Sequence, residues 1–176
     1  MNMASWLFKL HKLHFSTKQL QRNAANFGLL FDIDGVIVKG SRVLPPAVKA
    51  FEYLTDDNGN FRVPTLFVTN AGSVLPQTKA DQLSHALGVT ISPEQVIMSH
   101  SPLKMFKDYH HRHVLAVGQG PVKEIANHKG FNRVSTIDDV RAAFPTLDAV
   151  DHQRRKSGPF DKHFTPIDSV VLLGEP

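Results

Sequence analysis

The sequence predicts an α/β fold with a mostly parallel sheet and flanking helices, and three segments carry this prediction. Residues 27–38 and 63–70 are short runs of aliphatic, β-branched and aromatic residues bounded by turn residues, which is typical of buried strands. Between them, residues 45–54 place apolar residues at helical spacing behind a proline start. A strand–helix–strand unit of this kind indicates a parallel pair of strands.

The first strand ends in two carboxylates, in the run Phe-Asp-Ile-Asp-Gly. Side chains alternate along a strand, so Asp32 and Asp34 are expected to point the same way, and Gly35 allows the backbone to turn close to a ligand. An Asp-Gly pair also caps ordinary turns, and these residues alone leave that alternative open.

The second strand ends in a hydroxyl and an amide, Thr69 and Asn70. In an open α/β sheet the ligand crevice lies outside the carboxyl ends of the strands, so these two residues are expected beside Asp32 and Asp34. An ordinary polar step from strand to loop is the alternative interpretation of the Thr-Asn pair.

The Asp-x-Asp-Gly strand end, followed one strand–helix unit later by a strand ending in Thr-Asn, resembles the first two motifs of the haloacid dehalogenase-like (HAD) hydrolases, most of which are phosphatases. The resemblance covers residues 27–176 and includes Gly118–Val122 and Val170–Pro176. It is a resemblance to mitochondrial members of the branch that carries a large cap after the second motif. It implies a Rossmann-like HAD core for residues 27–176.

The chemistry of such a site follows from the residue types. A carboxylate can attack a phosphoryl group to form an aspartyl-phosphate, and Asp32 is the candidate nucleophile. Asp34 is the candidate general acid and base, which protonates the leaving oxygen and then activates water. The Thr69 hydroxyl and the backbone N–H groups of Asn70 and Gly35 are candidates for holding the phosphoryl oxygens of a phosphorylated small-molecule substrate.

A divalent cation is expected at this site because two carboxylates and a phosphate repel one another. Hard oxygen ligands favour magnesium. The resemblance implies that the Asp32 carboxylate and the Asp34 backbone carbonyl are two of its ligands.

The resemblance also implies a lysine from a third motif and further acids from a fourth, and neither motif is found in this chain. Residues 167–173 look like a strand leading toward the cap, so the sequence predicts an incomplete core: its N-terminal half, without the cap and with weak or no activity. Asp138-Asp139 reads as a helix start rather than a metal site. A non-catalytic, partner-binding protein of the same fold is the main alternative, and homo-oligomerisation is one way to compensate for the missing half.

Composition predicts one globular domain, because the chain has 176 residues and is 41% hydrophobic. No apolar run approaches the length of a membrane span. All 16 acids lie at or after Asp32, whereas four of the 20 Lys and Arg residues precede it, so the net charge of +4 belongs to the N-terminus. The remaining chain is neutral, which argues against binding to nucleic acid.

The first 26 residues contain no acid and place Trp6, Leu10, Leu13 and Leu20 on one helical stripe. This pattern predicts a mitochondrial transit peptide and hence a mitochondrial location. A disordered or surface helical tail is the alternative.

Residues 75–87 predict a helix with Leu83 and Leu87 on its buried face and Gly88 at its end. His100 could reach the crevice, but no pairing with a nucleophile can be read from the sequence, so it is left outside the site. The loop-like composition of residues 154–166 predicts a surface loop.

Two further motifs invite other functions. The cluster His110-His111-Arg112-His113 resembles a metal-binding tract, but a solvated helix end is the favoured interpretation. Residues 114–123 resemble a dinucleotide-binding turn, but Pro121 and Lys123 depart from that pattern, so a third core strand followed by a helix is favoured. A dinucleotide-binding domain is therefore the third functional hypothesis.

Overall fold

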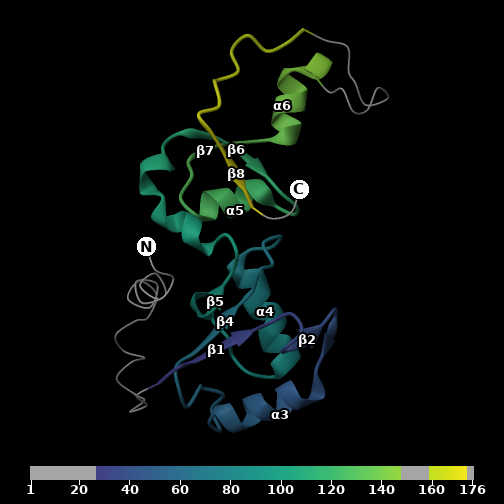
Figure 1. Ribbon diagram of the computed structural model, residues 1–176, viewed down its shortest axis with the longest axis vertical. Coiled ribbons are helices and arrows are strands. Elements are labelled where there is room, and N and C mark those ends of the chain that lie inside the picture. The colour runs from purple at the N-terminus through teal and green to yellow at the C-terminus, as the bar shows by residue number, and fades with distance from the viewer. Residues whose placement is uncertain (1–26, 148–158, 174–176) are drawn as a thin grey trace. The chain divides into compact units, whose positions relative to one another are not determined.

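The computed structural model describes residues 27–147 and 159–173, which divide into two compact units (Figure 1). Unit 1 contains residues 27–70 and 76–98, and unit 2 contains residues 71–75 together with the described residues from 99 onward. The predicted α/β class with mostly parallel sheets is confirmed, although the sequence did not predict this division. The predicted transit peptide and residues 154–158 of the predicted loop lie outside the described residues.

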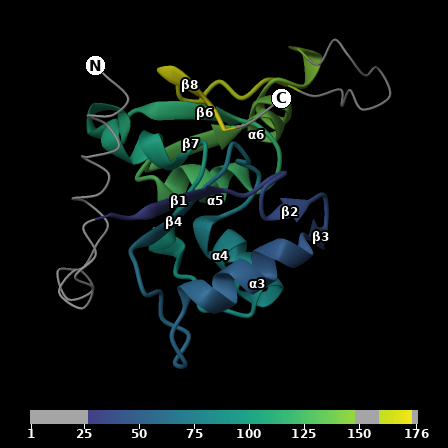
Figure 2. The same ribbon diagram turned by 60° about the horizontal axis from the view of Figure 1, so that its bottom comes forward.

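Unit 1 is built on a three-stranded parallel sheet in the order β1-β4-β5, with an antiparallel β2–β3 hairpin that follows β1 (Figure 2). The predicted strand–helix–strand unit is confirmed, because β1 and β4 are parallel and α3 lies between them in the chain. The elements of unit 1 are β1 (Leu29–Asp32), β2 (Val38–Lys39), β3 (Arg42–Val43), α3 (Pro45–Leu54), β4 (Thr65–Val68), α4 (Pro76–Leu87), the 3₁₀ helix η1 (Pro93–Gln95) and β5 (Val96–Ile97).

Aromatic rings form the centre of unit 1 between the sheet and α3. Phe51 of α3 is 1% exposed, and its ring centroid lies 5.0 Å from that of Phe31 on β1 and 5.6 Å from that of Phe67 on β4. These offset and tilted contacts add to the apolar area that the rings bury. On α4, Leu83 and Leu87 are buried as predicted.

The first strand is only half buried, where the sequence predicted a buried strand. Leu30 is 55% exposed and Asp32 is also exposed, whereas Leu29 and Phe31 are partly buried. Among the described residues β1 pairs with β4 alone, so it is an edge strand, and one of its faces lacks a covering layer. An apolar run does not by itself distinguish this arrangement from a strand buried on both faces.

Unit 2 has its own parallel sheet in the order β7-β6-β8. Its core is a separate cluster of buried apolar residues from β6, α5 and the segments that follow α5 and β8: Val114, Ala116, Ile125, Ala126, Phe131 and Leu173. The elements of unit 2 are the 3₁₀ helices η2 (Ser101–Met105) and η3 (Lys107–Tyr109), β6 (His113–Val117), α5 (Val122–His128), β7 (Arg133–Thr136), α6 (Ile137–Ala143), η4 (Pro145–Leu147) and β8 (Ser169–Leu172).

Two predictions from the sequence are tested by unit 2. The strand and helix expected around residues 114–123 are present as β6 and α5, but β6 pairs with β7 and β8 rather than forming a third strand of the sheet that contains β1 and β4. Asp138 and Asp139 do lie in the first turn of a helix, α6, as predicted. In the described part of the chain, no helix has both the length and the apolar character needed to cross a bilayer.

Replacing Phe67 with alanine should destabilise unit 1 by about 3–5 kcal/mol, because a fully buried ring would leave a cavity among its aromatic neighbours. Tyr53→Ala is the matched control, since that ring is 82% exposed and its loss should cost little. Urea unfolding of the two variants measures the difference, and equal midpoints would contradict this description of the core.

Candidate active site

The ends of β1 and β4 bring two of the predicted site residues into contact. The register pairs Asp32 with Val68, so the residues that follow the two strands leave the sheet at the same edge. There the Thr69 hydroxyl donates a hydrogen bond to Asp34 Oδ2 over 2.8 Å. Thr69 is 3% exposed, and its backbone N–H donates to the Ile97 carbonyl at 2.9 Å, which anchors it to β5. A buried, anchored hydroxyl therefore holds one oxygen of an exposed carboxylate.

Asp32 and Asp34 are both exposed, whereas Ile33 between them is 1% exposed. The alternation expected from a strand thus continues past the end of β1, with Ile33 packed inward and the two acids outward. Asp32 Oδ1 accepts the Ile33 N–H at 2.9 Å. This bond orients the Asp32 carboxylate at the strand end and leaves its second oxygen for a ligand or substrate.

A single tight turn follows β1 and determines where Asp34 lies. The Ile33 carbonyl accepts hydrogen bonds from the N–H groups of Ile37 at 2.9 Å and Val38 at 3.0 Å, which closes one helix-like turn. Gly35 lies in this turn with φ of 91°, a conformation that residues with a Cβ atom seldom adopt. The turn leads directly into the β2–β3 hairpin.

The two remaining predicted residues, Gly35 and Asn70, directly follow Asp34 and Thr69 in the chain, and they differ in how available their groups are to a ligand. Asn70 is exposed and directly follows Thr69. The Gly35 N–H, a candidate for holding a phosphoryl oxygen, donates instead to the Val38 carbonyl at 2.6 Å. A phosphoryl role for Gly35 would require this bond to exchange, so the role remains a prediction.

The donor atoms at this site suit a hard cation. Asp32 and Asp34 supply carboxylate oxygens, which magnesium prefers to nitrogen or sulfur ligands. Within residues 27–147 and 159–173, no three His, Asp or Glu side chains gather closely enough to hold a metal ion. Asp32 and Asp34 can therefore form part of a magnesium site but not a full set of protein ligands.

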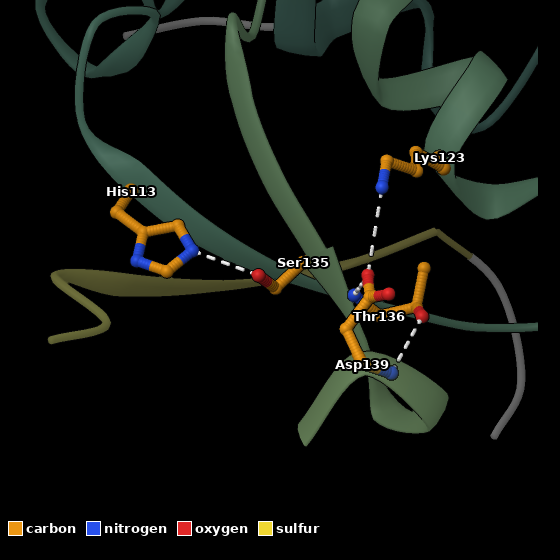
Figure 3. Close-up of polar contacts among 5 residues, drawn as sticks. All are labelled: His113, Lys123, Ser135, Thr136 and Asp139. Carbon is orange, nitrogen blue, oxygen red and sulfur yellow. Dashed lines mark hydrogen bonds and ion pairs between the residues drawn. The ribbon is translucent and has the colours of Figure 1, made fainter. Parts of the chain in front are cut away.

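The histidine cluster is only in part the solvated helix end that the sequence predicted. His110 follows the last residue of η3 and both His111 and Arg112 are exposed, whereas His113 is buried. His113 is the first residue of β6 and is 7% exposed. Its Nδ1 lies 2.9 Å from the Pro166 carbonyl and its Nε2 lies 2.8 Å from Ser135 Oγ (Figure 3). His110 is also half-buried, with its ring 5.0 Å from that of Phe131. Both rings contact other segments of unit 2, which the run of four polar residues did not indicate.

Lys123 and Asp139 also have structural contacts (Figure 3). Asp139 and Thr136 cap α6 reciprocally, because Asp139 Oδ2 accepts the Thr136 N–H at 2.8 Å and Thr136 Oγ1 accepts the Asp139 N–H at 3.2 Å. These bonds to Thr136, with a smaller contribution from Lys123, lower the pKa of Asp139. Lys123 Nζ lies 3.6 Å from the same carboxylate. The contacts favour the helix start that the sequence predicted for this acidic pair.

Comparison with known proteins identifies the family. A sequence profile of the family described as haloacid dehalogenase-like hydrolase matches residues 29–132, which is more than half of the chain and includes Asp32, Asp34 and Thr69. A mitochondrial hydrolase of Saccharomyces cerevisiae is 32% identical over 120 residues, which are 68% of this chain and 33% of the relative. A Schizosaccharomyces pombe protein named as a fusion of a CMP-forming cardiolipin synthase with a mitochondrial hydrolase is 30% identical over 192 aligned positions, covering 97% of this chain and 31% of that protein.

The fold is also found among solved structures. A hypothetical protein of Pyrococcus horikoshii matches with a TM-score of 0.51 at 23% identity, over 65% of this chain and 42% of that one. At this identity the match shows the fold alone. The chain spans about a third of the length of the two curated relatives, at 33% and 31%.

Replacing Gly35 with alanine should destabilise unit 1 by about 1–2 kcal/mol, because an L-residue is strained at this positive φ. Steric crowding is not the reason, since an added Cβ would meet no atom within 4 Å. Denaturant unfolding measures the cost, with Val36→Ala as the control at an adjacent side chain that is 51% exposed. A Gly35→Ala variant as stable as the control would show that the turn does not require glycine.

Proposed function

The chain belongs to the haloacid dehalogenase-like hydrolases, and on that premise we propose that it carries the nucleophile-bearing part of a magnesium-dependent phosphomonoester hydrolase that works through an aspartyl-phosphate. The main support is the Thr69–Asp34 hydrogen bond, 2.8 Å long, which joins side chains 35 residues apart at the ends of two paired strands. This contact joins a candidate proton carrier to a hydroxyl at one edge of a sheet, where α/β folds bind ligands, and the nucleophile candidate Asp32 ends β1 at the same edge.

The proposed reaction has two displacements at phosphorus. An Asp32 oxygen attacks phosphorus while the bond to the leaving oxygen breaks, and Asp34 gives its proton to that oxygen. In the second step Asp34 takes a proton from a water molecule, whose oxygen attacks phosphorus and breaks the bond to Asp32. Phosphate leaves and both acids return to their starting states, so one difficult step becomes two easier ones.

Thr69 has a specific place in this scheme. Its hydroxyl donates a hydrogen bond to Asp34 Oδ2, whereas Asp34 Oδ1 has no hydrogen bond among the described residues. Oδ1 is therefore the oxygen available to exchange a proton with the leaving group or with water. Because Thr69 is buried and anchored to β5, the carboxylate is oriented before substrate arrives, which lowers the cost of reaching a reactive geometry.

Magnesium would be held by the Asp32 carboxylate and the backbone carbonyl of Asp34, with further ligands from outside this set. When bound, it supplies positive charge that offsets the repulsion between the carboxylates and a phosphate. The donor chemistry at the end of β1 supports this assignment.

The names of the relatives bear on location and substrate. Both are called mitochondrial hydrolases, so we place this protein in mitochondria as well. The S. pombe relative combines its hydrolase with a synthase that forms CMP, which is itself a phosphomonoester. CMP therefore belongs in the first panel of substrates, beside a generic aryl phosphate and glycerol phosphate.

Asp32→Asn should abolish magnesium-dependent phosphate release from these substrates, because the amide cannot act as a nucleophile. Asp32 is exposed, so the substitution changes no buried group and the midpoint of urea unfolding should stay the same. Turnover by the 176-residue chain is expected to be weak, since the proposed site contains Asp32, Asp34 and Thr69 without an assigned lysine or additional acids. Phosphate release that is equal in the wild-type and Asp32→Asn chains would contradict the proposal and favour the non-catalytic, partner-binding alternative.

Thr69→Val should lower kcat by about 10- to 100-fold, because it removes the donor that orients Asp34 while keeping the shape of the side chain. Thr69→Ser retains the hydroxyl and should stay within a few-fold of wild type. Steady-state kinetics distinguish the two variants, and equal losses in both would show that packing of the Thr69 methyl group, rather than its hydrogen bond, is what matters.

A further inference from the structure

A five-residue segment carries the chain from the end of the candidate site to α4. Residues 71–75 directly follow Thr69 and Asn70 and have no regular secondary structure. They belong to unit 2, whereas the strand before them and the helix after them belong to unit 1. Such a segment lacks the repeated backbone hydrogen bonds of a helix or sheet, so its position depends on what it contacts. We call it segment 71–75.

Three residues of segment 71–75 are held by side-chain contacts within unit 2. Ser99 Oγ donates to the Ala71 carbonyl at 3.5 Å. The Nε2 atom of His100, a residue that is 2% exposed, lies 3.1 Å from the Val74 carbonyl, to which it donates because a carbonyl only accepts. Leu75 packs against the apolar core of unit 2.

The other two residues are held by close approach of the backbone. A Cβ atom added at Gly72 would lie 2.5 Å from both the Leu173 carbonyl oxygen and Ser99 Oγ. A Cβ atom added at Gly120, between β6 and α5, would overlap the Ser73 carbonyl oxygen and lie 3.0 Å from its carbon. Only glycine permits this spacing, so any larger residue at Gly120 has to push Ser73 away.

The strand beside β4 also continues into unit 2. The paired strands β4 and β5 end at Val68 and Ile97, and the Thr69 N–H donates to the Ile97 carbonyl. Two residues after Ile97 the chain enters unit 2 at Ser99, which contacts Ala71. The two chain segments that fix Thr69 are therefore joined by strand pairing before Thr69 and by Ser99 after it.

We propose that segment 71–75 positions the candidate active site: unit 2 holds the segment, and the segment keeps the Thr69 hydroxyl on Asp34. Only Asn70 separates Thr69 from the segment, and one residue spans about 3.5 Å of chain, so a shift of about 1 Å or more is passed on to Thr69. Gly120 is then a positioning residue that acts through Ser73. The effect on turnover rests on the proposed hydrolase function, whereas the effect on Thr69 does not.

Gly120→Ala tests the proposal, and Gly130→Ala is the matched control. Both glycines belong to unit 2 and have positive φ, 78° and 107°, so alanine is strained at either position. The added methyl group meets the Ser73 backbone in the first variant and the His110 ring in the second. Both variants should lose stability, but only Gly120→Ala should displace segment 71–75.

Amide hydrogen exchange of the 176-residue chain, followed by NMR, measures this displacement. In Gly120→Ala the Thr69 N–H should exchange about 10-fold faster or more, because its bond to the Ile97 carbonyl opens more often. In Gly130→Ala it should exchange as in wild type. The Gly88 N–H, which donates to the Ser84 carbonyl in unit 1, should be unchanged in both variants and so excludes general loosening of unit 1.

Magnesium-dependent hydrolysis of an aryl phosphate gives a second readout. Gly120→Ala should lower kcat by about 10-fold or more with little change in KM, because the orientation of Asp34 is lost rather than substrate binding. Gly130→Ala should keep both values. A wild-type chain without turnover would contradict the hydrolase proposal, while the exchange rates would still decide the role of segment 71–75.

Circular dichroism checks that Gly120→Ala is folded. If it is not, Gly72→Ala takes its place with the same expected increase in exchange at Thr69, because its Cβ meets the Leu173 carbonyl and Gly72 has no positive φ to add strain. Unchanged exchange at Thr69 in the folded variant, or an equal increase in Gly130→Ala, would overturn the proposal.

Discussion

The parallel pairing of β1 with β4 is the interaction on which the candidate active site depends. Its register sets Asp32 opposite Val68, so the segments that follow the two strands emerge side by side. Without this register the Thr69 hydroxyl could not reach Asp34, and the acids would be ordinary exposed residues at a strand end. The pairing extends over four residue pairs, so backbone hydrogen bonds between the strands, rather than contacts of the exposed side chains, fix the positions of Asp34 and Thr69. The aromatic contacts among Phe31, Phe51 and Phe67 hold that pair against α3.

The two units place basic and acidic chemistry in different surroundings. At the end of β1 the carboxylates are exposed, one is held by a buried hydroxyl, and the intervening Ile33 packs inward. In unit 2 the pattern is reversed, because Lys129 and His100 are buried. An exposed carboxylate remains free to exchange a proton or to meet a cation.

Much of the candidate site could be predicted from the sequence, because it depends on local periodicity and on where polar residues follow apolar runs. The alternation of Asp32, Ile33 and Asp34 and the placement of Thr69 beside them are of this kind, as is the helix start at Asp138 and Asp139. Other features depend on partners distant in the chain. The Gly35 N–H donates to the Val38 carbonyl through a turn that the residue types do not specify. One face of β1, with Leu30 and Asp32, is exposed, whereas Leu29 and Phe31 on the other face are partly buried. The burial of His113 depends on Ser135 and Pro166, which are distant in the sequence. The position of Lys129 had a sequence signal, since it follows buried Ile125 by one helical turn, but a lysine is rarely assigned to the buried face.

The central claim is that Asp32 forms a covalent bond to phosphorus, and chemical trapping tests it most directly. The chain is incubated with magnesium and an aryl phosphate and then reduced with borohydride, which converts an aspartyl-phosphate to homoserine, and the peptide containing residues 32–34 is sequenced by mass spectrometry. Homoserine is expected at position 32 and unmodified aspartate at position 34. Homoserine at position 34, or phosphate release with neither residue reduced, would contradict it.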